Sequence, residues 1–146
     1  MRSSKLVALV SSTAVAAMVT LAPADATAQA ASAAAMREAA NTFLAALTPV
    51  QRAEAMMYFN HGERFNWNES PGPRLGVVLR DLSDSQTQLA MELLRASTGE
   101  AGYHKIMMSL AREPVLSAMQ RTPQGAALRA PDLFYIAVFD TPSATD

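Results

Sequence analysis

At 146 residues, with a formal net charge of −1 and no cysteine, the chain has room for one domain and cannot use disulfides to compensate for a small core. Its 12 basic residues are offset by 13 acidic ones and nowhere cluster. Nucleic-acid binding therefore has no electrostatic basis in this sequence.

The first 30 residues have the layout of a secretory signal peptide. Arg2 and Lys5 precede an apolar run over residues 6–21, and small residues follow around Ala28 and Ala30. The run is short for a membrane span and lacks a positive charge on its far side. We expect cleavage after Ala28 or Ala30, no stable membrane span afterwards, and a periplasmic or secreted bacterial protein with a single helical domain over residues 31–146.

Two helices are expected between residues 33 and 60. Residues 33–47 are rich in alanine, the best helix former, and predict the first helix. Thr48 and Gln51 have the spacing of a capping box, and Pro49 suits the first helical position. The second helix is predicted to run from there to about Asn60.

A matching capping signal, Ser83 with Gln86, predicts a third helix that runs to about Ala96, with Gly99 beyond it. Segments 47–56 and 82–91 resemble each other, but the residues that follow them do not match. Two independently capped helices explain this similarity better than a helical repeat does.

The remaining chain predicts one more helical stretch and a strand. Residues 102–121 are helical in pattern, and the residues available for a core face are Ile106, Met107, Leu110, Val115, Leu116 and Met119. Pro114 is expected to kink the helix or to start a new one. Residues 133–139 are aromatic and β-branched, which favours a strand. Residues 75–79 are its one plausible partner within the chain; otherwise the partner is missing. The predicted fold is mainly α with minor β, with four to five helices, a Pro/Gly loop at 66–76 and the C-terminal strand.

Several short segments occur in an order that resembles a known bacterial family. They are RFNW, PGPRLG, LSDSQ, LL at 93–94, GYHKI, EPVL and YIAVFDTP. The chain resembles the domain of unknown function 3500 over about residues 41–142. Asp140 stands where that family has glycine, and the family continues into a His-containing region beyond the end of this chain. The resemblance implies either the N-terminal part of a longer domain or a naturally shortened member of the family, without an established activity.

The Pro/Gly loop is a candidate ligand site. Trp67 and Phe65 offer aromatic surface, and the Arg74 guanidinium suits a carboxylate. These residues could bind a small anionic or aromatic ligand. The favoured alternative is a structural plug in which Trp67 packs between helices. In that plug Arg74 would pair with one of three acidic residues, Glu63, Glu69 or Asp81.

Two histidine–methionine pairs are the only candidate metal ligands. Met57 and His61 are four residues apart, as are His104 and Met108, which would place each pair on one helix face. Thioether and imidazole ligands suit Cu(I). The favoured alternative is packed methionines and surface histidines, and no other cofactor is predicted.

No catalytic constellation is evident in the sequence. There is no cysteine, no nucleophile elbow and no pair of carboxylates with a suggestive spacing. We expect a non-catalytic binding or structural module of the bacterial envelope. The alternative is the N-terminal part of an enzyme or metalloprotein whose His-containing half is absent. An exposed edge on the C-terminal strand would favour a homo-oligomer or another pairing partner.

Overall fold

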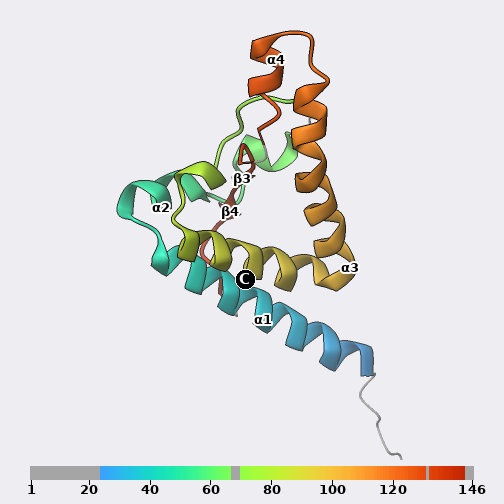
Figure 1. Cartoon of the computed structure of the whole chain (residues 1–146). Coiled ribbons are helices and arrows are strands. Elements are labelled where there is room, and N and C mark those ends of the chain that lie inside the picture. Colours follow the sequence, from blue (N-terminus) through green and yellow to red (C-terminus); the bar gives the residue numbers. More distant parts are fainter. Residues whose placement is uncertain (1–23, 67–69, 131, 144–146) are drawn as a thin grey trace, which may run out of the picture.

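The computed structural model describes residues 24–66, 70–130 and 132–143, with side chains from residue 32 onward (Figure 1). The described helices are α1 (Ala24–Ala46), α2 (Pro49–Ala55), α3 (Asp84–Ala118) and α4 (Pro123–Ala127). The strands are β1 (Met56–Met57), β2 (Val77–Val78), β3 (Tyr135–Ile136) and β4 (Val138–Phe139), with 3-10 turns at Gly62–Phe65 and Leu79–Asp81. The fold is mainly α with minor β, as the sequence predicts.

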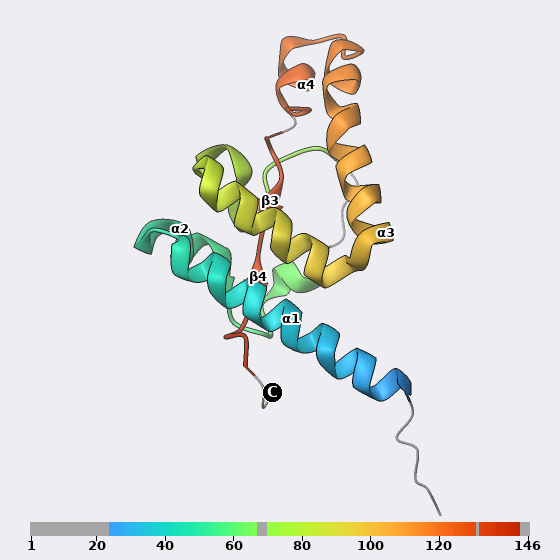
Figure 2. The same ribbon diagram turned by 60° about the horizontal axis from the view of Figure 1, so that its bottom comes forward.

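Helix α1 begins earlier than predicted and lies along the first part of α3 (Figures 1 and 2). Its many alanines allow the helix to extend without a break. Only its C-terminal part carries large apolar side chains, and Phe43 and Leu44 are buried there. None of the described helices combines the length and apolar character needed to cross a membrane.

Helix α2 is shorter than predicted, because the chain leaves the helix at Met56, forms the short strand β1 and continues into a turn. Met56 has extended backbone angles, and Met56 and Met57 pair in parallel with Val138 and Phe139. This pairing uses residues far apart in sequence, so local helix signals could not reveal it. The Met57 carbonyl also accepts a hydrogen bond of 2.7 Å from the Asp140 N–H.

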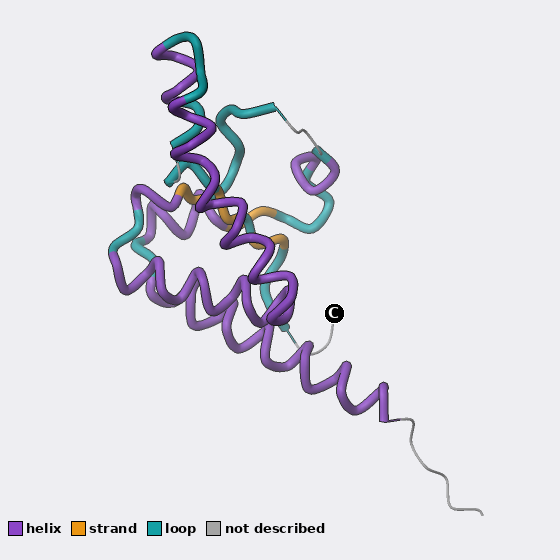
Figure 3. The backbone as a smooth tube through the Cα atoms, turned by 45° about the vertical axis from the view of Figure 1, so that its right-hand side comes forward, coloured by secondary structure: helices purple, strands orange, loops and turns teal. Residues whose placement is uncertain are grey.

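No new helix starts at Pro114, which lies inside α3 with helical backbone angles; the chain departs from helical angles at Gly99 instead. Gly99 has φ 66° and ψ 177°, and it alone within α3 departs from helical angles. These angles are accessible essentially only to glycine. They divide α3 into a proximal segment (84–98) and a distal segment (100–118) that run in different directions (Figures 1 and 3).

The C-terminal strand finds partners on two sides within the chain. Ala137 divides it, so that β3 pairs antiparallel with β2 and β4 pairs parallel with β1. The predicted partner at residues 75–79 is confirmed, and the partner is not missing. At Gly76, with φ 124°, an added Cβ would lie 2.7 Å from the Ile136 carbonyl oxygen, so this approach requires glycine.

The backbone conformation at Asp140 accounts for the glycine that stands at this position in the family that the chain resembles. Its φ is 70°, in the left-handed region that favours glycine. Aspartate tolerates this region because its short side chain can bond locally, and here Oδ1 accepts from the Thr141 N–H at 2.8 Å. The departure from the family pattern therefore preserves the turn.

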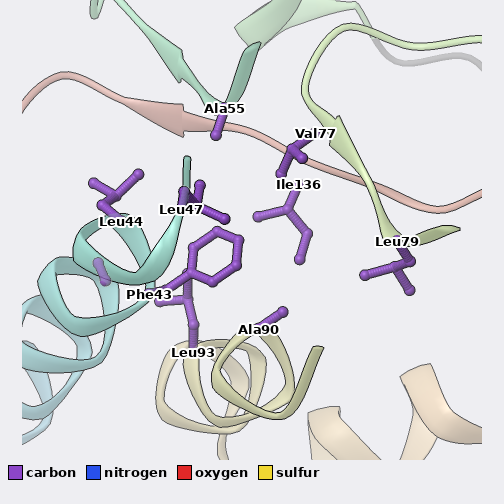
Figure 4. Close-up of a cluster of buried hydrophobic side chains, with 10 residues drawn as sticks. Phe43, Leu44, Leu47, Ala55, Val77, Leu79, Ala90, Leu93 and Ile136 are labelled. Carbon is purple, nitrogen blue, oxygen red and sulfur yellow. The ribbon is translucent and has the colours of Figure 1, made fainter. Parts of the chain in front are cut away.

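The core lies where α1, the proximal segment of α3 and the strands meet (Figure 4). The Phe43 ring is completely buried and points from α1 toward Leu47 and Ile136. Ala90 and Leu93 supply the α3 side. Ile136 is thus both a strand residue and a core residue, which joins the C-terminal segment to the helices.

Both predicted capping boxes are present. The Thr48 hydroxyl accepts from the Gln51 N–H at 3.3 Å, and the Gln51 amide oxygen accepts from the Thr48 N–H at 3.0 Å. Ser83 and Gln86 make the same pair of bonds, at 3.3 and 2.9 Å. Each box provides partners for backbone N–H groups that a helix start leaves unpaired.

The two capping glutamines also bind each other. Gln86 Nε2 donates to Gln51 Oε1 at 2.9 Å, and Gln51 Nε2 donates to Gln86 Oε1 at 3.3 Å. Gln86 Nε2 further donates to the Ala46 carbonyl at 2.9 Å, and Gln51 Nε2 to the Asp81 carbonyl at 2.6 Å. This amide pair therefore connects the end of α1 with the starts of α2 and α3.

An ion pair fastens the outer end of the β2–β3 ladder. Arg80 Nη2 lies 3.0 Å from Asp132 Oδ1, and the Arg80 N–H donates to the Asp132 carbonyl at 3.1 Å. The hydrogen bond from Arg80 holds the pKa of the Asp132 carboxyl below its ordinary value. Both side chains are about half exposed, so solvent screening keeps their stabilising effect small.

Gln86→Ala should lower the free energy of unfolding by roughly 1–2 kcal/mol, because it removes half of a capping box and leaves the partly buried partner Gln51 without its reciprocal bonds. Gln88→Ala is the control, since Gln88 lies exposed in the same helix. Urea unfolding monitored by circular dichroism measures both. Equal stability of the two variants would contradict a structural role for the amide pair.

Asp140→Ala should cost roughly 1–2 kcal/mol, because alanine keeps the left-handed strain and loses the bond to Thr141. Asp140→Gly should remain within about 1 kcal/mol of wild type, since glycine relieves the strain but gains freedom in the unfolded chain. Urea unfolding monitored by circular dichroism measures the free energy of unfolding of both variants. The interpretation fails if alanine is tolerated as well as glycine.

Candidate functional site

The distal segment of α3 packs much less tightly than the proximal one. The buried residues of α3 are Gln86, Ala90 and Leu93, all in the proximal segment. Val115 in the distal segment is 63% exposed and Met119 just beyond it is 71% exposed, although the sequence had suggested both for a core face. Ile106 and Leu110 are partly buried. The bend at Gly99 therefore leaves the distal segment's apolar face incompletely covered.

A cavity of about 400 Å³ lies on this incompletely covered face, which we call the elbow pocket. Its size is within the range of small-molecule sites. Its walls come from both segments of α3 and from the chain around β2 and β3. The lining residues are Leu79, Met91, Leu94, Lys105, Ile106, Ser109, Leu110, Phe134, Tyr135 and Ile136.

The walls of the elbow pocket are mostly apolar; apart from Tyr135 on β3, its polar side chains lie on the distal segment of α3. Lys105 and Ser109 are four residues apart, on one face of the helix. The Ser109 hydroxyl donates to the Lys105 carbonyl at 3.1 Å and accepts from Arg112 Nη2 at 3.2 Å. Lys105 and Ser109 thus line one side of the apolar cavity, and Arg112, which is outside the lining, lies against Ser109. We call these three residues the rim.

A second cavity brings together residues from two sequence predictions. Met57, His61 and Arg74 line a space of about 500 Å³, here called the loop pocket. Arg74 donates to the carbonyls of Pro73 at 3.1 Å and Ser70 at 2.6 Å, which helps to hold the loop. The candidate ligand residue and one candidate metal pair are therefore neighbours.

The other residues of the predicted ligand loop are placed differently. Phe65 is 69% exposed, and the Arg64 guanidinium lies 5.4 Å from its ring centre. Phe65 does not line the loop pocket. Trp67 and Glu69 lie outside the described residues, so the packing expected of Trp67 stays a prediction. Among the described ion pairs, none joins Arg74 to Glu63 or Asp81.

The predicted copper ligands do not share one site. Met57 belongs to β1, so the expected helix-face geometry with His61 is absent. His61 Nδ1 accepts from the Glu63 N–H at 3.1 Å, which places the proton of a neutral imidazole on Nε2. In that orientation His61 is a donor, and it would have to give up this cap to bind a metal.

His104 and Met108 keep the helical spacing that the sequence predicts, but they lie exposed on the distal segment of α3. Neither lines the loop pocket. Within residues 24–66, 70–130 and 132–143, no three His, Asp or Glu side chains gather in a way that could hold a metal ion. Cu(I) binding stays a prediction.

The comparison with protein families identifies the chain. A family model described as "Protein of unknown function (DUF3500)" matches residues 29–146. The chain belongs to the DUF3500 family. This confirms the resemblance seen in the sequence, and the match includes both capping boxes, the Gly99 bend and every residue of the elbow pocket. No curated protein and no solved structure matches the chain.

Sequence reasoning did not find the elbow pocket in this DUF3500 member. Lys105 was an isolated surface cation in the sequence, and Ile106 and Leu110 were expected in a core. The signal that was available is the spacing of Lys105, Ser109 and Arg112 along one helix face. Only the bend at Gly99 shows that this face borders a cavity.

Gly99→Ala should reduce stability by roughly 1–3 kcal/mol through backbone strain alone, because no atom lies within 4 Å of an added Cβ. Gly62→Ala is the matched control, since its Cβ also meets nothing within 4 Å and Gly62 does not have a positive φ. Urea unfolding compares them. If Gly99→Ala is as stable as Gly62→Ala, the bend does not depend on glycine.

Proposed function

We propose that this protein is an exported, non-catalytic binding module of the bacterial envelope that holds a small, largely apolar molecule in the elbow pocket. The observation that carries the proposal is the apolar cavity between the two segments of α3 and the chain around β3. Ligand sites typically combine apolar walls with a few polar groups that orient the ligand. The elbow pocket has this composition.

The side chains around the elbow pocket favour binding over catalysis. Its ionisable residues are Lys105 and Tyr135, and neither described histidine lines it. Lysines that act as nucleophiles or bases are desolvated ones, whereas Lys105 is exposed. A general acid and base pair would need two convergent groups with separate roles, which the described lining does not provide.

Export is proposed on the layout of residues 1–30, where Arg2 and Lys5 precede an apolar run and small residues. The family match begins at residue 29, beside the expected cleavage positions. Expression of the full chain in a bacterium, fractionation, and mass spectrometry of the protein test this part. A cytoplasmic protein that keeps its first residues would overturn it.

Binding in the elbow pocket is tested with the neutral fluorescent dye Nile red. Leu110→Trp should fill the cavity and weaken dye binding at least about tenfold, since the indole would occupy the space of the ligand. Val115→Trp is the matched control, because Val115 lies on the same helix segment, is 63% exposed and does not line the pocket. It should bind the dye as wild type does.

Circular dichroism and urea unfolding verify that each variant is folded, and Ile106→Trp replaces Leu110→Trp if that variant fails to fold. The proposal is wrong if wild type does not bind the dye. It is also wrong if a folded, pocket-filling variant binds as tightly as Val115→Trp, because the dye would then bind elsewhere.

A further inference from the structure

Building on the proposed binding function, we infer that the ligand of the elbow pocket is an amphiphilic anion. Its apolar chain would lie against the walls, and its carboxylate or equivalent anionic group would lie at the rim formed by Lys105, Ser109 and Arg112. The inference rests on an apolar cavity whose lining includes one cation, Lys105, and on Arg112, which donates to the lining residue Ser109.

The rim has a positive charge that the described chain does not neutralise. The distal segment contains two acidic residues, Glu100 and Glu113. Glu100 lies 3.3 Å from Arg95, and Glu113 lies 3.6 Å from Arg129. Both acids are therefore engaged with arginines outside the rim.

Lys105 and Arg112 form no ion pair among the residues that the structure describes. Their side chains are exposed, so they can meet a ligand without first leaving another carboxylate. A ligand anion would supply the missing opposite charge. A cationic ligand would instead meet like charges at the same edge.

Ser109 gives the rim a defined geometry. Its hydroxyl accepts from Arg112 and donates to the Lys105 carbonyl, so the guanidinium is held on the helix face that borders the cavity. The two cationic residues lie two helical turns apart on that face, with the hydroxyl between them. Ser109 is thus a positioning residue for Arg112.

The walls exclude a ligand that is polar throughout. Apart from the rim, the cavity presents chiefly the apolar atoms of residues such as Leu79, Met91, Leu110 and Phe134. Polar groups of a sugar or nucleotide would lose water there without gaining hydrogen bonds, which is unfavourable. An alkyl or aromatic chain with a single anionic end satisfies both parts of the site.

Isothermal titration of the full folded protein with decanoate, decanol and decyltrimethylammonium, each below its micelle concentration, tests the inference. We expect decanoate to bind about tenfold more tightly than decanol, and decyltrimethylammonium to bind more weakly than either, because two cations line the rim. Raising the salt concentration should reduce the preference for decanoate.

The variant Lys105→Gln/Arg112→Gln should lose the preference and bind decanoate and decanol equally. Arg52→Gln/Arg121→Gln is the charge-matched control, because both arginines are exposed and neither lines the pocket. Ser109→Ala should weaken decanoate binding less than the double substitution.

The outcomes separate the two proposals. If decanol and Nile red bind in the elbow pocket but wild type shows no preference for decanoate, the anion inference fails and the proposed function stands. A preference for decanoate that survives the double substitution also overturns the inference. If none of the three amphiphiles binds, and Nile red does not, the proposed function itself fails.

Discussion

The reciprocal amide pair between Gln51 and Gln86 is the interaction on which the arrangement of the helices depends. Each glutamine completes the capping box of its own helix and also binds the other glutamine. Gln86 in addition reaches the last turn of α1 through the Ala46 carbonyl. Because one buried side chain serves three helix ends, the relative positions of α1, α2 and the start of α3 are set together, next to the core around Phe43.

The contacts that hold α3 in the core end before Gly99, and the candidate site exists because the helix changes direction there. The proximal segment of α3 belongs to the core, whereas the distal segment turns away and shares few side chains with it. A straight α3 would carry Lys105 and Ser109 away from β3. The bend instead places them beside Phe134 and Tyr135, with space between. Stability and the proposed ligand binding therefore depend on different parts of one helix.

Local signals in the sequence predicted the parts of this fold that depend on neighbouring residues. The pairs Thr48–Gln51 and Ser83–Gln86 predicted two helix starts, and the aromatic and β-branched residues at 133–139 predicted a strand. The end of α2 could not be predicted, because Met56 and Met57 leave the helix to pair with residues near the other end of the chain. Gly99 was expected only to terminate a helix, and nothing local indicated that the helix would resume at an angle. The candidate site could not be predicted because it depends on that angle.

The position of residues 133–139 also determines when the chain can fold. Strands β1 and β2 receive their described partners from this one segment, and Ile136 completes the core. These pairings join Met56 to Val138 and Val77 to Ile136, which are far apart in sequence, so they cannot form before residues 133–139 have been synthesised. Until then, Met56 and Val77 lack their strand partners. Formation of the native core therefore waits for a segment that is made long after the helices it joins.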